Sequence, residues 1–506
     1  MSAESPAKIC VVIGRTRHKI MQVEIHEAAK RGARLMELRL DFLAKPPDFK
    51  RLLAKKPCPL IATVRRPSDG GRYKGSEDDR LTLLRQAIVG GFDWVDIETD
   101  VIKQIPRYRD VKRIVSYHNL REVPDDLEKI HAAMCNQDAD LVKLAMAAQQ
   151  PEDNLRVLEL VRKSHKPTVA FCMGDMGFPS RILSVQLGAP YTYAAFNKER
   201  GIAPGLPSHD ELSKVYNVDH LDRDTKVYGV IGDPVSHSLS PLIHNRCFKE
   251  LGINAIYLPF RVPRGDLPGF MKAFDAVPVH GYSVTIPHKE GAAELPGQKD
   301  QLVTLIHAAN TLVRGSHGWR SFNTDAAAAV ESLKAHLPRT DGQVTMLSSR
   351  SILILGAGGV ARAVAHALHR EGANLILANR THDRAQKLAE ELNCRAVDWN
   401  ARHNVLSDTV INCTSVGMFP NMDESPLHGS YLKPGLLVFD TIYTPENTLL
   451  IKEARDRGCH VLTGVDMFVR QAAMQFKLFT GVEPPLELMH TTIRRALSPV
   501  AIRDET

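Results

Sequence analysis

The chain has 506 residues, too many for one ordinary domain, so two or three domains are expected. A hydrophobic content of 43% with 24% charged residues fits globular domains that bury large cores. The formal net charge of +7 is mild at this length. It suits anionic small molecules, and without a block of Lys and Arg it argues against a nucleic-acid partner.

The eight cysteines are scattered and none forms a C-x-x-C pair, which predicts reduced thiols, a cytoplasmic location and no metal site. The N-terminal sequence MSAESPAK lacks the apolar core of a signal peptide. No apolar run reaches the length that spans a bilayer, so no membrane partner is expected. The sequence leaves the oligomeric state open.

From Lys8 to about Phe196, short β-rich segments alternate with segments long enough for a helix. About eight such strands predict an α/β fold that begins with a (β/α)8 barrel. In the first helix, Ile20, Val23, Ala28 and Ala29 are the expected apolar positions. The expected strands lie in KICVVIG, RLMELRLDF, PLIATVR, WVDIET, KRIVSYH, DLVKLAM, PTVAFCMG and YTYAAF.

Barrel active sites lie at the carboxyl ends of the strands, and here these ends are rich in charge. Lys143 interrupts a strand otherwise fit for burial, and burial favours the neutral, nucleophilic amine. The alternatives are a Lys that extends into solvent and, for His118, an ordinary core histidine. The residues at or near these ends are Glu37, Arg39, Asp41, Arg65, Glu98, His118, Lys143, Met173 and Arg181.

Several of these residues form motifs that resemble type I 3-dehydroquinate dehydratase over roughly residues 8–217. The resemblance implies that Lys143 forms a Schiff base with the substrate ketone and that His118 moves the protons. It also implies that Arg181 holds the substrate carboxylate and that Glu37, Arg39 and Arg65 bind its hydroxyls. The motifs are Glu37-x-Arg39-x-Asp41, Ser116-Tyr117-His118, the Lys143 strand and Met173-Gly174…Ser180-Arg181.

Two positions depart from that family. Asp69 stands where the family usually has a Glu that orients the histidine. Ile202 and Leu206 stand where it presents a hydroxyl and an amide to the substrate. We therefore expect a high KM with an ordinary kcat, and a lower KM in Leu206→Gln. The alternative is that Leu206 packs inward and closes the loop.

After a capping box at Ser208–Glu211, the polar run 219–225 is the expected linker. A strand at Lys226–Ile231 follows. Ser240 is expected to cap the next helix, with Pro241 at its first position and Gly252 at its end. Beside this helix N-terminus, the hydroxyl of Ser238 could bind a carboxylate.

Lys289 and Asp325 could exchange a proton with a substrate hydroxyl if the fold brings them together in a cleft. From spacing alone, the alternative is a surface lysine and an Asp that caps the Ala-rich helix of residues 326–335.

A dinucleotide site is predicted by the stretch SILILGAGGVARA, residues 351–363. A buried strand at Ile352–Leu355 runs into a G-x-G-x-x-G/A turn, a helix from Val360 to about His369, and a second strand at Ala373–Ala378. That second strand ends in Asn379-Arg380-Thr381 without the carboxylate of NAD sites. Arg380 can pair with a 2′-phosphate, so NADP is favoured, unless Arg380 is only a solvated surface residue.

The C-terminal half, about residues 226–500, is similar to shikimate dehydrogenase in Ser238-Leu239-Ser240-Pro241, residues 284–289 (VTIPHK), Asn310-Thr311, Asn323-Thr324-Asp325, residues 412–418 (NCTSVGM) and residues 471–473 (QAA). The resemblance implies an acid–base pair, Lys289 and Asp325. It implies substrate contacts from Ser238, Ser240, Thr285, Asn310, Asp325, Tyr443 and Gln471. It implies NADP contacts from Gly356, Ala357, Gly358, Gly359, Val360, Ala361, Asn379, Arg380, Thr381, Thr414, Ser415 and Gly464.

The two halves are therefore expected to catalyse consecutive reactions of the shikimate pathway, dehydration of 3-dehydroquinate and NADPH-dependent reduction to shikimate. Two alternatives stay open: a ligand sensor without catalysis, and an NAD-dependent quinate dehydrogenase as the C-terminal half. The expected domains are a barrel over residues 1–218, a linker over 219–225, a substrate domain over 226–325, a Rossmann domain over 326–470 and C-terminal helices over 471–506.

Overall fold

The computed structural model describes residues 6–201, 205–337, 339–340, 343–344 and 346–498. The chain forms two compact units. The first runs through Val227 and includes residues 233–241 and 252–279, and the second contains residues 228–232, 242–251 and the chain from His280 onward.

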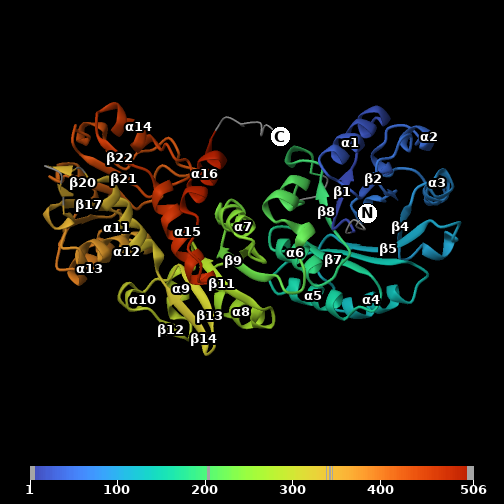
Figure 1. The fold of residues 1–506 in the computed structure, drawn as a ribbon, viewed down its shortest axis with the longest axis horizontal. Coiled ribbons are helices and arrows are strands. Elements are labelled where there is room, and N and C mark those ends of the chain that lie inside the picture. The colour runs from blue at the N-terminus through green and yellow to red at the C-terminus, as the bar shows by residue number, and fades with distance from the viewer. Residues whose placement is uncertain (1–5, 202–204, 338, 341–342, 345, 499–506) are drawn as a thin grey trace. The chain divides into compact units, whose positions relative to one another are not determined.

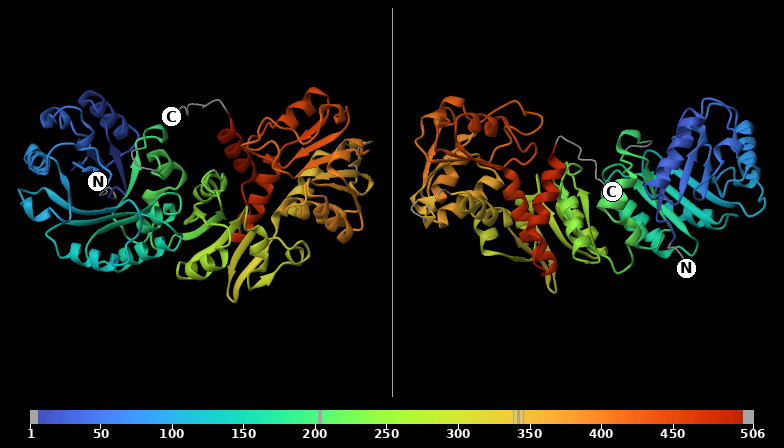
Figure 2. Two further views of the ribbon diagram at one scale, coloured as in Figure 1. Left: turned by 180° about the vertical axis from the view of Figure 1, so that it is seen from behind. Right: turned by 45° about the horizontal axis from the view of Figure 1, so that its top comes forward.

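The N-terminal part is the predicted barrel. Its eight strands form one sheet in the order β7-β6-β5-β4-β3-β2-β1-β8, with parallel pairing throughout, and the helices lie outside the strands (Figures 1 and 2). The strands are β1 Ile9–Ile13, β2 Met36–Arg39, β3 Leu60–Thr63, β4 Trp94–Glu98, β5 Lys112–Asn119, β6 Leu141–Ala147, β7 Thr168–Met173 and β8 Thr192–Ala195.

The barrel helices are less regular than the sequence pattern predicts. After β4, among the described residues, a 3-10 turn at Ile102–Gln104 takes the place of an α-helix, because little chain remains before β5 and Pro106 interrupts it. The α-helices are α1 His18–Lys30, α2 Phe49–Leu52, α3 Glu77–Gly90, α4 Leu127–Cys135, α5 Asp153–Lys163 and α6 Phe178–Gln186.

The predicted apolar face of α1 is wrong in part. Ile20 and Val23 are exposed, whereas Met21, Ile25 and Ala28 are buried with Glu24. The buried residues recur at spacings of three and four, which places them on one helical face toward the sheet. The apolar side chains of Ile20 and Val23 misled the prediction because a helix of this length offers two candidate stripes.

The segment that follows β8 lies against the barrel. Ser208 Oγ accepts a hydrogen bond from the backbone N–H of Glu211, and a π-helical turn spans Glu211–Val215. In the expected linker, Leu221 is buried, Asp219 accepts from the N–H of Lys8, and Gln186 Nε2 donates to the carbonyl of Thr225.

A mixed sheet follows, in the order β10-β9-β11-β13-β14-β12. Its strands are β9 Lys226–Gly232, β10 Ala255–Arg261, β11 Val279–Val284, β12 Gln298–Lys299, β13 Thr311–Gly315 and β14 Gly318–Phe322. The associated helices are α7 Ser240–Glu250, α8 Leu267–Ala273, α9 Lys289–Glu294 and α10 Gln301–Ile306. A short hairpin, β15 Arg339–Thr340 and β16 Gln343–Val344, precedes the last sheet.

The last sheet has six parallel strands in the order β19-β18-β17-β20-β21-β22, which is the Rossmann order. Both faces are buried, since alternate residues of β17 enter two different apolar clusters. The strands are β17 Ser351–Leu355, β18 Asn374–Ala378, β19 Arg395–Val397, β20 Thr409–Asn412, β21 Leu437–Asp440 and β22 His460–Leu462. The helices are α11 Thr324–His336, α12 Gly359–Arg370, α13 His382–Glu391, α14 Leu449–Asp456, α15 Gly464–Thr480 and α16 Leu486–Leu497.

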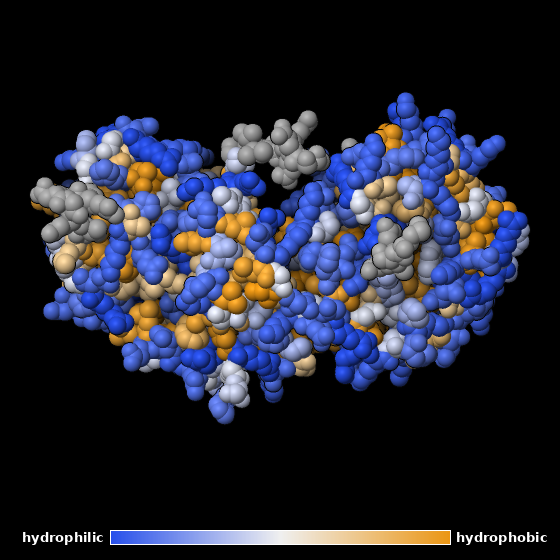
Figure 3. Space-filling view, in the orientation of Figure 1, coloured by the Kyte–Doolittle hydropathy of each residue, from blue (hydrophilic) through white to orange (hydrophobic). Residues whose placement is uncertain are grey.

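The surface drawn in Figure 3 is largely hydrophilic, with apolar residues in small separate areas. Within the described part of the chain, no helix is both long enough and apolar enough to cross a membrane.

Candidate active sites

Lys143 lies inside the barrel, as its place in an apolar strand predicts. Its side chain is 6% exposed, and its Nζ donates to Glu37 Oε2 at 3.1 Å and to Asp96 Oδ2 at 2.9 Å. The same nitrogen lies 4.2 Å from the centre of the Tyr193 ring. Burial alone favours the neutral amine, but two carboxylates and an aromatic face favour the ammonium.

Asp96, on β4, contacts Lys143, Arg65 and Ser116. Its side chain is fully buried, and it accepts from Ser116 Oγ at 2.6 Å while Arg65 Nη2 lies 2.7 Å away. Arg65 and Lys143 hold the pKa of Asp96 far below its usual range, against the opposing effect of burial. Arg65 also pairs with Glu98 at 2.8 Å, and Glu98 with Arg80 at 2.6 Å. The sequence analysis did not single out Asp96, although its alternation with Glu98 in WVDIE places both carboxylates on one face of the strand.

His118 lies on β5, two residues after Ser116, so both side chains face the same side of the strand. Burial, and then the charges of Arg65 and Lys143, hold the pKa of His118 well below its ordinary value, so the ring is a neutral base. Its Nδ1 is buried without a hydrogen-bond partner among the described residues.

Asp69 does not orient His118 in the described structure. Its carboxylate is paired with Arg66 and accepts from Ser68 Oγ at 3.0 Å, while Arg66 also binds Asp100. The shorter side chain at position 69 is therefore held in its own 3-10 turn, Pro67–Asp69.

Arg181, on α6, is a buried cation that makes no ion pair with the part of the chain that the structure describes. It is 1% exposed, its guanidinium carbon lies 4.4 Å from the centre of the Phe171 ring, and its Nε and Nη1 have no hydrogen-bond partner among the described residues. Burial lowers its pKa to about 10. A buried guanidinium of this kind can bind an anionic ligand.

Arg39 differs, because Asp41 already binds it through two hydrogen bonds of 2.9 and 2.8 Å. Asp41 also accepts from the backbone N–H of Arg72 at 2.9 Å. Asp41, in the 3-10 turn Leu40–Phe42 that follows β2, thus fixes the guanidinium of Arg39 and neutralises its charge.

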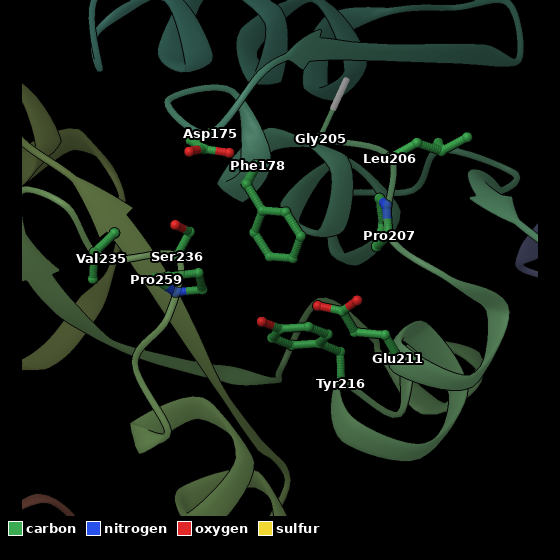
Figure 4. Close-up of a pocket in the computed structure, with 10 residues that line it drawn as sticks. All are labelled: Asp175, Phe178, Gly205, Leu206, Pro207, Glu211, Tyr216, Val235, Ser236 and Pro259. Carbon is green, nitrogen blue, oxygen red and sulfur yellow. The ribbon is translucent and has the colours of Figure 1, made fainter. Parts of the chain in front are cut away.

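In the loop after β8, Leu206 is half-buried and packs against the apolar cluster of the barrel interior, which includes Phe171 and Tyr193. Figure 4 shows its side chain pointing away from the space between Phe178 and Tyr216, whose rings are 5.3 Å apart. This favours the alternative in which Leu206 packs inward. Ile202, the other altered loop position, lies outside the described residues.

In the C-terminal half, the predicted dyad forms. Lys289 Nζ donates to Asp325 Oδ2 at 2.6 Å, with side chains 15% and 8% exposed. Asp325 does not cap α11, because Asn323 accepts from the N–H groups of Asp325 and Ala326. Capping by Asn323 leaves the Asp325 carboxylate available to Lys289.

Ser238 and Ser240 lie at the start of α7. The helix begins at Ser240 itself, and Ser238 Oγ accepts from the N–H of Ser240. Ser238 Oγ therefore binds the first backbone N–H of the helix. Ser240 is buried and Ser238 half-buried.

Asn310 is held by α11 and α15. It binds Thr324 through its Nδ2 and Oδ1, at 2.9 and 2.8 Å, and Gln475 Nε2 donates to its carbonyl at 3.0 Å. Sequence reasoning missed Gln475, one helical turn beyond Gln471. Gln471 itself donates to the carbonyl of Phe468.

A backbone hydrogen bond holds Thr285 in place, and an aromatic contact holds Tyr443. The N–H of Thr285 donates to the carbonyl of Ile231 at 2.9 Å. The Tyr443 ring stacks on Phe468 with centroids 4.3 Å apart, and burial raises the pKa of its hydroxyl.

The Gly-rich turn has the geometry of a dinucleotide site. Gly356 has φ of 113°, and a Cβ there would lie 3.0 Å from the Cys413 carbonyl, so this position requires glycine. A Cβ at Gly358 would meet no atom within 4 Å, and α12 begins one residue later. The turn therefore leaves an open space at a helix N-terminus, which suits a pyrophosphate.

The other predicted NADP residues lie in this turn and the start of α12, after β18 and β20, and at the start of α15. Arg380 and Thr381 are exposed after β18, where Asn379 Nδ2 donates to the Thr381 carbonyl. Asn412 Oδ1 accepts from the N–H and the hydroxyl of Thr414. Ala357 and Val360 are half-buried, Ala361 is buried in α12 and Ser415 is exposed. Gly464 packs on backbone, since a Cβ there would lie 2.4 Å from the Ile442 carbonyl.

Comparison with known proteins decides the family. Residues 9–223 match the family model for type I 3-dehydroquinase. Residues 230–312, 340–419 and 464–494 match those for the shikimate dehydrogenase substrate-binding domain, shikimate/quinate 5-dehydrogenase and the shikimate 5-dehydrogenase C-terminal domain. A bifunctional 3-dehydroquinate dehydratase/shikimate dehydrogenase of Arabidopsis thaliana, described as chloroplastic, is 36% identical over 96% of this chain and 84% of its own. The chain belongs to this bifunctional family.

Two further relatives match the C-terminal half. The NADP⁺ shikimate dehydrogenase of Methanopyrus kandleri is 42% identical over 54% of this chain and 96% of its own. The crystal structure of a shikimate dehydrogenase in complex with NADP⁺ superimposes with a TM-score of 0.51 at 35% identity, over 55% of this chain and 97% of that one.

This bifunctional dehydratase–dehydrogenase therefore combines a lyase and an oxidoreductase of the shikimate pathway, and its cofactor is NADP. The sequence-based expectations of family, fold class, enzymatic activity and cofactor are confirmed.

Proposed function

We propose that Lys143 and His118 carry out the dehydration of 3-dehydroquinate in the barrel. The observation that carries this proposal is a buried lysine in contact with two carboxylates, in the same barrel as a neutral histidine base. Lys143 Nζ bonds to the ketone carbon, and the ketone oxygen leaves as water with two hydrogens from the nitrogen. The resulting imine keeps the single positive charge of the ammonium.

His118 then removes a proton from the adjacent carbon, and the electron pair moves into the imine. The same histidine returns the proton to the leaving hydroxyl, which departs as water. A second water hydrolyses the imine and restores Lys143. The net change is the loss of one water from the substrate.

Substrate binding in the barrel rests on Arg181, which would bind the substrate carboxylate through its Nε and Nη1, the two nitrogens without a hydrogen-bond partner among the described residues. Glu37, Arg39 and Arg65 would contact the hydroxyls. Arg39 and Arg65 are already paired with carboxylates, so they position the substrate with little net charge of their own.

In the dehydrogenase, Lys289 and Asp325 form the acid–base pair. NADPH, when bound, supplies the hydride. The Lys289 ammonium gives a proton to the oxygen of the substrate ketone, and Asp325 orients that ammonium through its 2.6 Å contact. Further substrate contacts are proposed from Ser238, Ser240, Thr285, Asn310, Tyr443 and Gln471.

The cofactor residues are proposed from the Rossmann turn. Residues 356–361 would hold the pyrophosphate at the N-terminus of α12, and Asn379, Arg380 and Thr381 the 2′-phosphate. The remaining contacts are proposed from Thr414, Ser415 and Gly464. The eight free cysteines support a reducing compartment, and we propose the cytoplasm.

The domain limits are proposed as 1–218 for the barrel, 226–325 for the substrate domain, 326–470 for the Rossmann domain and 471–506 for the C-terminal helices. Residues 219–225 join the first two.

A coupled assay tests the proposal. Wild-type protein given 3-dehydroquinate and NADPH should consume NADPH and form shikimate. Lys143→Ala should stop this flux, and added 3-dehydroshikimate should restore it, whereas Lys289→Ala should accumulate 3-dehydroshikimate. Shikimate formation from 3-dehydroquinate by Lys143→Ala would refute the assignment of Lys143.

A further inference from the structure

Two buried carboxylates, Glu37 and Asp96, contact the proposed Schiff-base lysine, Lys143. Glu37 and Asp96 both touch Lys143 Nζ, but Glu37 lies on β2 with the proposed substrate contacts, whereas Asp96 faces protein groups. Asp96 Oδ1 accepts from Ser116 Oγ, and its Oδ2 lies within 2.9 Å of both Lys143 and Arg65. All four side chains are buried.

This arrangement holds the carboxylate rigidly in one charge state. Arg65 and Ser116 would keep Asp96 in place and ionised even when Lys143 turns toward a substrate, since neither contact depends on Lys143. Arg65 is itself fixed by Glu98, which belongs to the same strand as Asp96. A fixed negative charge beside Nζ is therefore a property of the fold and not of the bound ligand.

We propose that Asp96 is the counter-ion of the cationic imine and a positioning residue for Lys143. The inference rests on the proposed function, in which Lys143 is the imine-forming residue. The ammonium and the protonated imine carry the same single charge at nearly the same place, so one carboxylate serves both. An imine that loses its proton is a poor electron sink, and a buried counter-ion prevents that loss.

The groups around Lys143 that bear on its charge come from several strands of the barrel. Glu37 and Asp96 favour the cation, and Arg65 and His118 lie close enough to Asp96 to lower its pKa. Tyr193 presents its ring to Nζ, and Cys10 interacts with both Glu37 and Lys143. Asp96 differs from the other groups because it touches Nζ and is also held by two protein groups, Ser116 and Arg65, neither of which depends on Lys143.

The test compares Asp96→Asn with Glu98→Gln. Both remove one buried carboxylate from β4 and one partner of Arg65, but only Asp96 touches Lys143. The alkaline limb of the dehydratase kcat profile should move to lower pH by about one to two units in Asp96→Asn. Trapping with borohydride and 3-dehydroquinate, read as added mass on the Lys143 peptide, should fall in rate by roughly tenfold or more at pH 8. Glu98→Gln should have the same alkaline limb of the kcat profile and the same trapping rate as wild type, even if its KM changes.

Ser116→Ala serves if Asp96→Asn does not fold. It removes the hydrogen bond from Ser116 Oγ to Asp96 and the one that Ser116 Oγ accepts from Arg65, and it leaves every charge in place. It should therefore move the same limb in the same direction by a smaller amount. If wild-type protein is not labelled on Lys143, the proposed function fails. If it is labelled and the alkaline limb is the same in wild type, Asp96→Asn and Ser116→Ala, the counter-ion role alone is refuted.

Discussion

Lys289 Nζ and Asp325 Oδ2 lie 2.6 Å apart, although the two residues belong to helices α9 and α11 and are separated by β13 and β14 in the sequence. The pair is not a capping interaction, since Asn323 caps α11. Its side chains are only 15% and 8% exposed, so the contact is shielded from water. A shielded lysine–carboxylate pair of this kind is suited to moving a proton at a substrate oxygen.

We therefore expect Lys289→Ala to lower the kcat of shikimate dehydrogenation by roughly 10²–10⁴, the usual scale for an acid–base group. Substrate KM should change less, because the ammonium acts mainly in the transition state. Steady-state kinetics with shikimate and NADP⁺ measure both. The exposed neighbour Glu290, changed to Gln, is the matched control. A near-normal kcat in Lys289→Ala would remove it from the mechanism.

A substitution that inactivates one active site should leave the activity of the other site unchanged. Lys143→Ala should abolish dehydration and the borohydride-dependent mass on the Lys143 peptide, while the dehydrogenase keeps its wild-type kcat. The reason is that the barrel and the Rossmann sheet have separate apolar cores. Loss of both activities in a variant with a wild-type circular dichroism spectrum would contradict independent sites.

Cofactor choice should depend on Arg380, whose exposed guanidinium follows β18. Arg380→Ala should weaken NADPH by roughly 10- to 150-fold, the range for charge-assisted hydrogen bonds, and leave NADH nearly unchanged. Fluorescence titration with both nucleotides measures this. Arg395→Ala, an exposed arginine at the start of β19, is the control. Equal weakening of both nucleotides would mean a structural role.

Asp440 should make the Rossmann domain less stable as the pH rises. Burial raises its pKa to about 6, although it accepts from Thr448 Oγ1, Asn412 Nδ2 and the N–H of Ile442. The unfolded carboxyl ionises near its ordinary value, so between about pH 4 and 6 the folded state binds more protons. The contribution of Asp440 to the free energy of unfolding is then fully present below about pH 4. It decreases by about 3 kcal/mol as the pH rises through 6.

Asp440→Asn removes this titration. Its Tm should vary less than that of wild type between pH 5 and 8, whereas the exposed Asp423→Asn should follow wild type. Calorimetry at several pH values measures the difference. Parallel curves for wild type and Asp440→Asn would show that Asp440 does not titrate in this range.

The sequence predicted the strands of the barrel and the Rossmann turn well because their signals are local. Apolar runs such as Ile352–Leu355 and glycines with required positive φ, such as Gly356, leave few alternatives. Asp96 was not predicted, since a carboxylate in a strand gives no sign of its partners, which are Lys143 on β6, Ser116 on β5 and Arg65 just after β3. Likewise, nothing in the order Ser238-Leu239-Ser240 shows which hydroxyl caps α7.

The loop residue Leu206 is where the structure changes the prediction most. An amide at this position was expected to lower KM by adding a hydrogen bond to the substrate. Leu206 instead packs on the interior cluster with Phe171, so Leu206→Gln removes apolar contact that holds the loop beside the barrel. Losing about 1 kcal/mol of this contact should raise KM by roughly fivefold and leave kcat unchanged. Leu206→Met, which keeps the apolar volume, should retain the wild-type KM. Initial-rate kinetics of the dehydratase decide between the two: a KM lowered tenfold in Leu206→Gln would mean that the added amide outweighs the lost packing.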